Sequence, residues 1–447
     1  MRVIMILLVL VLALPASGQE RSDYRYHDSL TYSMYLEKRW SELTDAGTDA
    51  LKAGHDFYYM RMRIGIAWFE RGQYAGAALH FRRALEHNSG DAVALEYLYY
   101  CNLYSGEYGA ASRLIASLGR EHGKKVQEES GLARNTVTLS AYYNGFDTDA
   151  FVENPSVWFS DTEPGSETVA RSIVNPSVSM SHNISPGVYY IHSFNNVTKS
   201  SLLHYYDGTR VVNLNNQKVF QNQYYGSFSF SSAGGYTFRP YLHGVVTVYD
   251  YILPLTGMSS GFYTVLRETA FHYSAGVNLR KRAGYFAVDG GVAVNKFGNG
   301  RALQGEAGLK IYPLGNSNFY LGGRFAGVLQ PEMAFSEISS VKPVYTITAG
   351  ISIPKAATAE FSFIAGEFRN FTTGNGLYLF NSPDFITERI LLNFTIPLGN
   401  KRGTALFIGG GLNRHRSVWY SAANKYSENQ TLNYKSFNLN GGVLWNF

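Results

Sequence analysis

The sequence has few charged residues, a single cysteine and no long apolar run beyond its first residues. Charged residues make up 16% of the 447 residues, against roughly 25% in ordinary soluble domains. With only Cys101, the chain cannot form an internal disulfide, and we interpret this residue as a small buried side chain in a helix. The formal charge of +5 is modest for this length and does not argue for binding to nucleic acid.

The sequence also lacks motifs with a known catalytic or metal-binding mechanism. It contains no Walker loop, no HExxH motif and no CxxC pair. The strongest enzymatic candidate is the pair His272 and Ser274, which lie two apart on one expected strand. We assign their shared face to a barrel interior, out of reach of a lipid ester, and therefore expect no catalytic residue, no cofactor and no metal. The acidic segment 147–167 could bind calcium, but it lacks EF-hand spacing and fits a solvated external loop better.

The first residues have the layout of a secretory signal peptide. Arg2 provides a positive start, residues 4–14 are apolar, and Ala16-Ser17-Gly18 is a small-residue cleavage site. We predict a signal peptide over 1–18. The alternative, an uncleaved anchor helix, is disfavoured because the apolar run is too short for an easy membrane span.

A membrane protein without further apolar helices has to cross the bilayer as a closed sheet, because unpaired backbone groups are costly in hydrocarbon. The residues that are abundant fit this expectation. Hydrophobic residues make up 45%, and there are 45 Gly, 34 Tyr and 28 Phe. Transmembrane barrels have an apolar outer face and aromatic residues at both rims.

From about residue 134, apolar residues alternate with polar or small ones. Every second residue of 345–353 is apolar, and 271–279, 303–311 and 319–329 follow similar patterns. Since successive side chains of a strand point to opposite faces, one face is apolar and the other polar. A soluble sandwich alternates too, but here the spacers are short and long in turn, as in outer-membrane barrels.

We predict an antiparallel transmembrane β-barrel of about 14 strands, within a range of roughly 12–16. The strands are expected to begin near residues 134, 170, 186, 217, 236, 266, 284, 301, 318, 342, 357, 384, 403 and 433. Short spacers such as 185–187 are expected to be periplasmic turns. Long spacers such as 331–340 and 370–383 are expected to be external loops.

Several charged residues fall on the polar face of the predicted strands. They either line a pore and set its selectivity, or pair across a plugged interior. Their mixed signs leave the choice between anions and cations open. These residues are Arg239, Arg280, Glu306, Lys310, Arg324, Glu360 and Arg389.

Residues 20 to about 130 instead show a helical period. The spacing around residues 64–85 resembles a tetratricopeptide repeat, a helix-turn-helix unit of 34 residues. A step of 34 residues leads from Gly72 to Gly106 and from Tyr74 to Tyr108, whereas Ser89 and Asn102 depart from the pattern. The packing positions that we assign are Trp40, Gly65, Trp68, Gly72, Tyr74, Ala77, Phe81, Ala84, Gly106, Tyr108 and Ala111.

The last residues resemble the terminal β-signal of outer-membrane barrels. Asn440, Gly442, Trp445 and Phe447 occupy its polar, glycine and two aromatic positions. Trp445 and Phe447, together with Tyr236 near another strand end, also fit interfacial anchors.

The whole chain resembles uncharacterised bacterial outer-membrane β-barrel proteins with N-terminal periplasmic tetratricopeptide repeats. This resemblance implies an α+β multidomain chain, with a short helical solenoid over 19–130 and an outer-membrane barrel over 131–447. The partners that it implies are outer-membrane lipid, the barrel-insertion machinery at the C-terminal strand, and a periplasmic protein at the repeats.

The expected function is a channel or export component with a protein-docking module; the repeats could equally be a spacer without a specific ligand. Exporters of surface polysaccharide share this architecture, which is an analogy only. The alternatives are a non-conducting anchor that presents the repeats and, less well supported, a lipid-modifying barrel enzyme.

Overall fold

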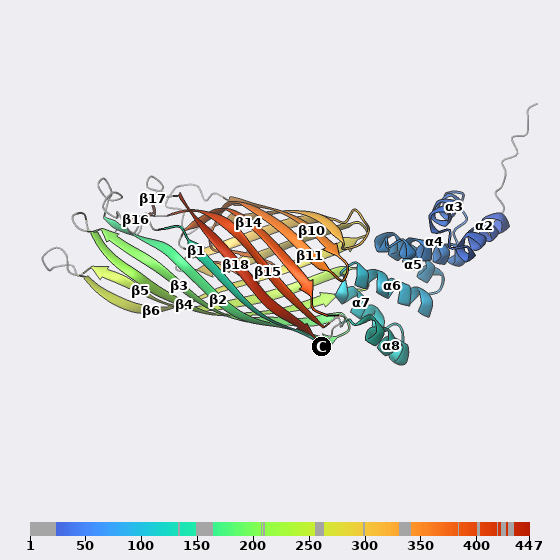
Figure 1. Cartoon of the computed structure of the whole chain (residues 1–447), viewed down its shortest axis with the longest axis horizontal. Helices are drawn as coiled ribbons and strands as arrows, with labels where there is room; N and C mark the ends of the chain where they lie inside the picture. Colours follow the sequence, from blue (N-terminus) through green and yellow to red (C-terminus); the bar gives the residue numbers. More distant parts are fainter. Residues whose placement is uncertain are drawn as a thin grey trace, which may run out of the picture. The chain divides into compact units, whose positions relative to one another are not determined.

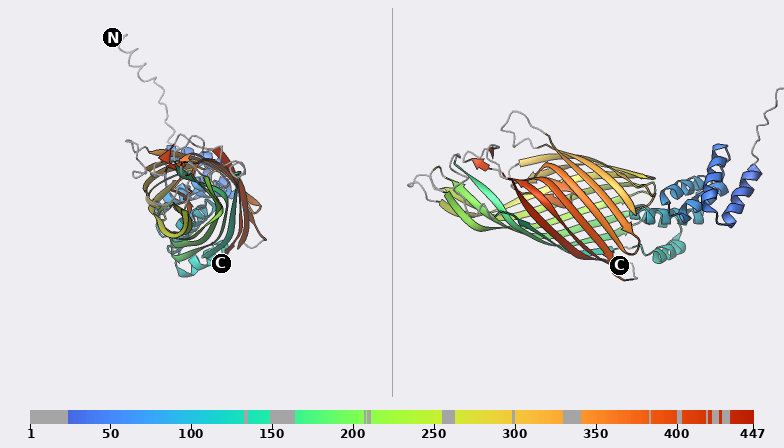
Figure 2. Two further views of the ribbon diagram at one scale, coloured as in Figure 1. Left: turned by 90° about the vertical axis from the view of Figure 1, so that its left-hand side faces the viewer. Right: turned by 45° about the horizontal axis from the view of Figure 1, so that its top comes forward.

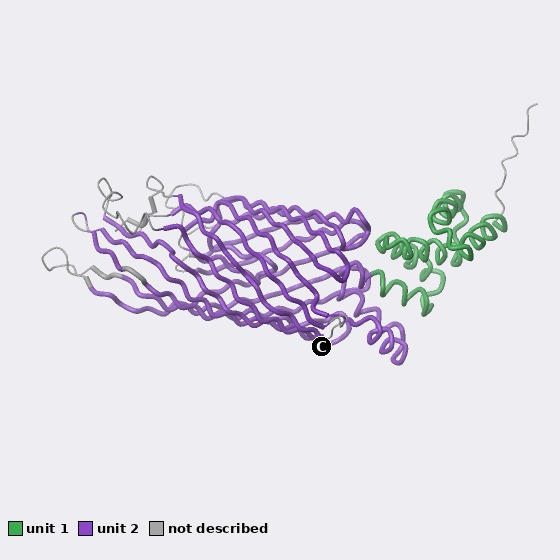
Figure 3. Tube along the Cα trace, in the orientation of Figure 1, with its two compact units in different colours: residues 1–101 green, residues 102–447 purple. Residues whose placement is uncertain are grey.

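The computed structural model describes residues 24–132, 135–148, 164–206, 208, 211–254, 263–297, 300–329, 341–382, 384–399, 403–417, 419–421, 426–427 and 433–447. The predicted signal peptide and most of the acidic segment 147–167 lie outside them. The chain divides into two compact units, Met1–Cys101 and Asn102–Phe447 (Figure 3). Each unit is described by itself.

Helices occupy the N-terminal part of the chain, and their starting points repeat. They are α2 Tyr24–Leu36, α3 Trp40–Lys52, α4 Tyr58–Glu70, α5 Tyr74–His87, α6 Ala92–Tyr104, α7 Tyr108–Ile115 and α8 Arg120–Ser130. The starts of α2, α4 and α6 are separated by 34 residues, and so are those of α3, α5 and α7. None of these helices is long and apolar enough to cross a membrane.

The turns within the helix pairs repeat with the same spacing. Lys38, Gly72 and Gly106 adopt a left-handed conformation, with φ of 56°, 72° and 77°. Such a residue commonly ends a helix, and glycine adopts it without the steric cost of a side chain. After each, a backbone N–H bonds back five residues: Arg39 to Met34, Gln73 to Trp68, and Glu107 to Asn102.

Small residues let the helices of the first unit pack closely. A Cβ on Gly65 would lie 2.8 Å from the ring of Phe81, which is fully buried. Ala77 and Ala84, on the same helix as Phe81, are also fully buried, and Trp40 and Trp68 pack at the edge of a neighbouring apolar cluster. Trp40, Gly65, Trp68, Ala77, Phe81 and Ala84 therefore lie in or beside this core, whereas Gly72 lies at a turn.

Cys101 is buried at the end of this unit. Burial raises the pKa of its thiol, because the thiolate is disfavoured away from water. The structure thus agrees with a packing role for this residue.

The second unit contains a closed antiparallel β-barrel. Its strands are β1 Asn135–Phe146, β2 Gly165–Ser185, β3 Val188–Tyr206, β4 Val211–Ser231, β5 Tyr236–Pro254, β6 Tyr263–Ala283, β7 Phe286–Phe297, β8 Gly300–Ile311, β9 Phe319–Leu329, β10 Lys342–Ile353, β11 Ala357–Phe368, β14 Phe385–Pro397, β15 Thr404–Arg416 and β18 Asn433–Asn446. Each pairs with its neighbours, and β1 closes the ring by pairing with both β2 and β18 (Figure 2). The prediction of 14 strands is confirmed. Closure leaves no sheet edge unpaired.

We call the two ends of the barrel the short-turn end and the long-loop end. The short-turn end carries the turns at 186–187, 232–235 and 284–285, together with Asn135 and Phe447, which exchange backbone hydrogen bonds. Toward the long-loop end, strands β2 to β6 run for 19 to 21 residues, whereas β7 to β11 have only 11 or 12 (Figure 1). The short strands β16 Trp419–Ser421 and β17 Tyr426–Ser427 extend the sheet beside β2 there.

The two faces of the barrel wall differ in polarity, as the alternation predicts. Ile347, Phe271 and Leu439 are 57%, 61% and 58% exposed on the outside. His243 and Ser274, on the inward side, have no exposed surface. A wall with apolar side chains outside and polar ones inside suits lipid on one side and an enclosed polar space on the other.

The spacer 370–383 is not the external loop that the sequence suggested. Its residues form the strands β12 Phe371–Thr373 and β13 Tyr378–Phe380, which pair as a hairpin and contact inward side chains of the wall. The residues between these strands are Gly374, Asn375, Gly376 and Leu377. The first three have φ of 62°, 58° and 83°, which is why two glycines are needed here.

The compact units divide at a different point from the predicted domains. The last helix ends at Ser130 and the first strand begins at Asn135, but the units separate between Cys101 and Asn102. Helices α7 and α8 thus belong with the barrel.

Gly442 in the closing strand tests the packing at the seam of the barrel. A Cβ there would lie 2.2 Å from the backbone oxygen of Leu139 and 2.5 Å from the ring of Phe407. We expect Gly442→Ala to lower the free energy of unfolding in micelles by about 1–3 kcal/mol, because neighbouring backbone has to shift. Denaturant unfolding followed by fluorescence measures this change.

Gly441→Ala is the matched control, since its Cβ would meet the nearest atom, the oxygen of Phe407, at 3.4 Å. We expect that variant to change the unfolding free energy by less than about 0.5 kcal/mol. Equal effects of the two substitutions would contradict this account of the seam.

Candidate functional site: the interior of the barrel

The hairpin between β11 and β14, residues 371–380, lies inside the barrel, and we call it the lumen hairpin. Its base is held by apolar contacts. Phe371 and Phe380 pack with Phe368, and Phe371 joins a buried cluster with Val344 and Ile364 of the wall. Burial of these side chains holds the base of the hairpin against β10 and β11.

The tip of the lumen hairpin contacts strands on the opposite side of the barrel interior. The Tyr225 hydroxyl donates a hydrogen bond to the Asn375 carbonyl at 2.9 Å, and His243 Nδ1 lies 2.8 Å from the Gly376 carbonyl. Between β11, where the hairpin begins, and β5, which carries His243, the ring passes through β10, β9, β8, β7 and β6. In a ring of 14 strands these positions are nearly opposite, so the hairpin spans the interior.

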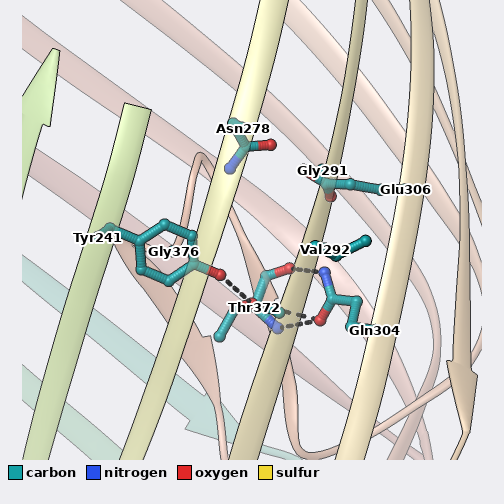
Figure 4. A pocket seen from close by; sticks show the side chains of 9 residues that line it. Tyr241, Asn278, Gly291, Val292, Gln304, Glu306, Thr372 and Gly376 are labelled. Atoms are coloured by element: carbon teal, nitrogen blue, oxygen red, sulfur yellow. Dashed lines mark hydrogen bonds between the residues drawn. The ribbon is translucent and has the colours of Figure 1, made fainter. Parts of the chain in front are cut away.

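The middle of the lumen hairpin is held by one amide side chain. Gln304 Nε2 donates to the Thr372 carbonyl at 2.8 Å, and its Oε1 accepts from the Thr372 N–H at 3.0 Å (Figure 4). Gln304 thus pairs with the hairpin as a neighbouring strand would. Tyr241 contributes its hydroxyl, 3.4 Å from Thr372 Oγ1.

The tip packs closely against the ring of Tyr241. A Cβ on Gly376 would lie 2.0 Å from Cε2 of that ring, so only glycine fits. The pocket beside the tip is lined by Asn278, Glu306 and Thr372 among others, and it has room for about one water molecule. This is too little for a large solute.

Charged residues gather between the lumen hairpin and the short-turn end. Arg324 pairs with Asp289 at 2.6 Å and with Glu306 at 2.7 Å, across three adjacent strands. The Tyr320 hydroxyl bonds Glu360, and the Lys310 ammonium lies 4.6 Å from the Tyr320 ring centre. These charges are largely neutralised within the wall.

Helix α7 is attached to the short-turn end by a second charged cluster. The Glu107 carboxylate accepts hydrogen bonds from Arg280 at 2.8 and 2.9 Å, and Arg282 donates to the Ser105 carbonyl at 2.6 Å. The Ser112 hydroxyl accepts from the Gly187 N–H at 3.3 Å. Glu107 is only 7% exposed, so these bonds are shielded from water.

The seven predicted interior charges lie on the inward face, but their surroundings differ. Arg324 and Glu306 pair with each other, Glu360 accepts a bond from a tyrosine, and Arg280 binds α7. Lys310, Arg239 and Arg389 have no carboxylate within salt-bridge distance among the described residues. Their role in a pore remains a prediction.

The predicted β-signal lies at the end of β18, and its last residue, Phe447, directly follows the strand. Asn440 faces inward and donates to Asn393 Oδ1 at 3.2 Å, while Trp445 and Phe447 are 39% and 67% exposed on the outside. Tyr236, at the same end, stacks under the Lys281 ammonium at 3.7 Å. Aromatic rings and a cation at one rim are the groups expected at a lipid–water boundary.

His272 and Ser274 are both buried in the wall. Among the described residues, no group of three or more His, Cys, Asp or Glu side chains could hold a metal ion.

Sequence reasoning missed the lumen hairpin and the residues that hold it, above all Gln304 and Tyr225. The signal that could have revealed it is Gly374-Asn375-Gly376 between the aromatic residues Phe371 and Tyr378, a pattern typical of a tight hairpin. It also missed Asp289 and Glu107.

Comparison with known proteins gives a limited result. No family model matches the sequence, and no curated protein matches it. Among solved structures, the Pseudomonas putida toluene transporter TodX has 9% identity and a TM-score of 0.42, over 70% of this chain and 90% of that one. The Ralstonia pickettii toluene transporter TbuX has 9% identity and a TM-score of 0.43, over the same shares.

A Pseudomonas aeruginosa FadL homologue matches with 8% identity and a TM-score of 0.40, over 70% of this chain and 90% of that one. At these identities and TM-scores the likenesses assign no family, substrate or location to this chain.

Glu107 tests the attachment of α7. Glu107→Gln removes the charge that binds Arg280 and leaves Arg282 without its carboxylate, so α7 should detach more often. Because Arg280 is one-third exposed, we expect a moderate effect, an amide hydrogen exchange in α7 at least about tenfold faster.

Glu121→Gln, in the exposed first turn of α8, is the control and should leave exchange in α7 unchanged. Unchanged exchange in the Glu107 variant would show that this cluster does not hold the helix.

Proposed function

We propose that this protein is an outer-membrane channel or export component, closed in the described state by its lumen hairpin, with a periplasmic helical array for docking. The observation that carries the proposal is a closed barrel with an apolar outside and a polar inside, spanned by one hairpin. An anchor needs no polar interior and no hairpin across it.

The outer face supports a place in a lipid bilayer. The shorter strands, such as the 12-residue β10, suffice to cross the hydrocarbon at a tilt. Outward residues along them are large and apolar. The predicted signal peptide and the β-signal support export to the outer membrane, and the usual placement of short turns supports a periplasmic position for Asn135, Phe447 and the helices.

The attachment of the lumen hairpin supports a gate. Its tip and middle are held by hydrogen bonds between neutral groups, each of which contributes only about 1 kcal/mol. Its base is held by apolar packing and is linked covalently to β11 and β14. A segment fixed at its base and weakly bound at its tip can swing without disturbing the wall.

Removal of the lumen hairpin tests the channel. We expect replacement of residues 372–379 by a short Gly-Ser turn to raise single-channel conductance in planar bilayers at least about tenfold, because the barrier across the interior is lost. Gly376→Val, which forces the tip away from Tyr241, should give frequent openings. Gly305→Ala, whose Cβ meets no atom within 4 Å, is the control.

Absence of current from all these proteins, with the barrel intact, would favour the non-conducting anchor.

The helical array supports a docking role. Three helix pairs follow one another at 34 residues, with a repeated turn and repeated hydrogen bonds, which is the layout of tetratricopeptide repeats. The first unit also exposes Tyr26, Tyr32 and Tyr59, at 60%, 49% and 63%. Tyrosine is enriched at protein interfaces, so we propose that these helices bind a periplasmic protein.

Photo-cross-linking in cells tests this docking. A cross-linking amino acid at Tyr59 should give a discrete protein adduct, whereas one at Tyr143 on the barrel exterior, 40% exposed, should not. If neither position captures a protein, the array is a spacer.

We also propose that the barrel has no catalytic function. Substitution of His272 and Ser274 should then leave the lipid composition of the membrane unchanged.

A further inference from the structure

Three cations inside the barrel have only neutral partners. They are Lys199 on β3, Arg239 on β5 and Arg389 on β14. None has a carboxylate within salt-bridge distance among the described residues. Lys310 shares this property, but it lies over the ring of Tyr320, whose hydroxyl bonds the carboxylate of Glu360.

The described interior carboxylates have other partners, and two of them, Glu360 and Asp384, accept hydrogen bonds from the hydroxyls of Tyr320 and Tyr434. Asp289 and Glu306 both bind Arg324, and Glu367 binds Arg416 at 2.8 Å and Lys342 at 3.1 Å. At the short-turn end, the single carboxylate Glu107 faces Arg280 and Arg282. The described acids therefore form no ion pair with Lys199, Arg239 or Arg389.

The contacts of each cation are with uncharged groups. Lys199 Nζ donates to the Asn381 side chain at 3.0 Å and to its carbonyl at 3.3 Å. The Arg389 guanidinium lies 5.1 Å from the Phe380 ring centre. Arg239 Nη2 is 3.4 Å from Ser229 Oγ.

The two arginines among these cations retain hydrogen-bond donors for a ligand. The Nε atoms of Arg239 and Arg389 are buried and have no hydrogen-bond partner among the described residues. A buried donor on a cation is costly to leave unpaired, so an anion in the interior would relieve that cost. Planar guanidinium groups bind carboxylate and phosphate groups in particular.

The three cations also bracket the lumen hairpin. β5 starts at the short-turn end, so Arg239 lies nearer that end than Tyr241, which packs against the hairpin tip. Arg389 faces Phe380, the last residue of the hairpin, and Lys199 binds the residue that follows it. An anion that passed the hairpin would meet a positive charge before it and beyond it.

We propose that the pathway selects anions, and that the exported or imported substrate carries carboxylate, sulfate or phosphate groups. This inference rests on the proposed channel function. It identifies Lys199, Arg239 and Arg389 as the residues that set the selectivity, by attraction of the passing anion and exclusion of cations.

The experiment uses the full chain with residues 372–379 replaced by a short turn, which keeps Phe380 and Asn381. Its reversal potential is measured in planar bilayers under a KCl gradient. We expect chloride to be more permeant than potassium, and each of Lys199→Gln, Arg239→Gln and Arg389→Gln to lower the chloride-to-potassium permeability ratio at least about twofold.

Lys281→Gln is the matched control, because this cation lies over Tyr236 on the outer face and its loss should leave the ratio unchanged. Arg239→Lys keeps the charge and should keep the selectivity. Should the Arg239→Gln barrel fail to assemble, Lys199→Gln, which removes a charge without touching a guanidinium, gives the same readout.

The outcomes separate the two proposals. Current that is unselective or selects potassium would overturn the inference and leave the channel standing, as would a ratio that falls equally in the Lys281 control. Absence of any current would overturn both the channel and the inference.

Discussion

Closure of the sheet through β1 is the constraint on which the rest of the structure depends. A strand in hydrocarbon needs a hydrogen-bonded partner on both sides. Because β1 pairs with both β2 and β18, neither the first nor the last strand of the barrel has an unpaired edge. The seam is tightly packed, because a Cβ added at Gly442 would lie too close to Leu139 and Phe407. Once the ring is closed, every second side chain is committed to the inside.

Polar side chains enclosed in the barrel need hydrogen-bonding or charged partners, and three kinds of partner occur in the interior. Arg324 binds two acids on neighbouring strands, Gln304 binds the backbone of an inserted hairpin, and Arg280 binds a helix outside the wall. The second and third of these are the basis of the proposed function. One holds the lumen hairpin across the interior, and the other attaches α7 to the short-turn end.

The sequence was informative where a single local rule decides the structure. The alternation of apolar and polar residues located the starts of the strands to within a few residues. The exceptions are β2 and β4, which begin five and six residues earlier than expected. The face of each interior charge followed from the same rule. The helix starts follow the same 34-residue spacing that the sequence shows, although the sequence analysis gave no helix bounds.

Features that depend on contacts between distant segments could not be read in this way. The segment 370–383 contains six Asn, Thr and Ser residues and two glycines, as an external loop can. Contacts from other strands, such as those of Gln304 and Tyr225, show that it turns inward. Glu107 pairs with Arg280, 173 residues away. Which interior cations remain without an acid depends on all such pairs together, so the mixed signs in the sequence could not indicate a preference.

A membrane-embedded cylinder is the claim on which the channel, the gate and the selectivity all depend. Its most direct measurement is the behaviour of the protein in isolated membranes and on a semi-native gel. The protein should require detergent for extraction and should migrate faster unheated than after boiling. Release into the aqueous fraction without detergent, with no change of migration on heating, would contradict it.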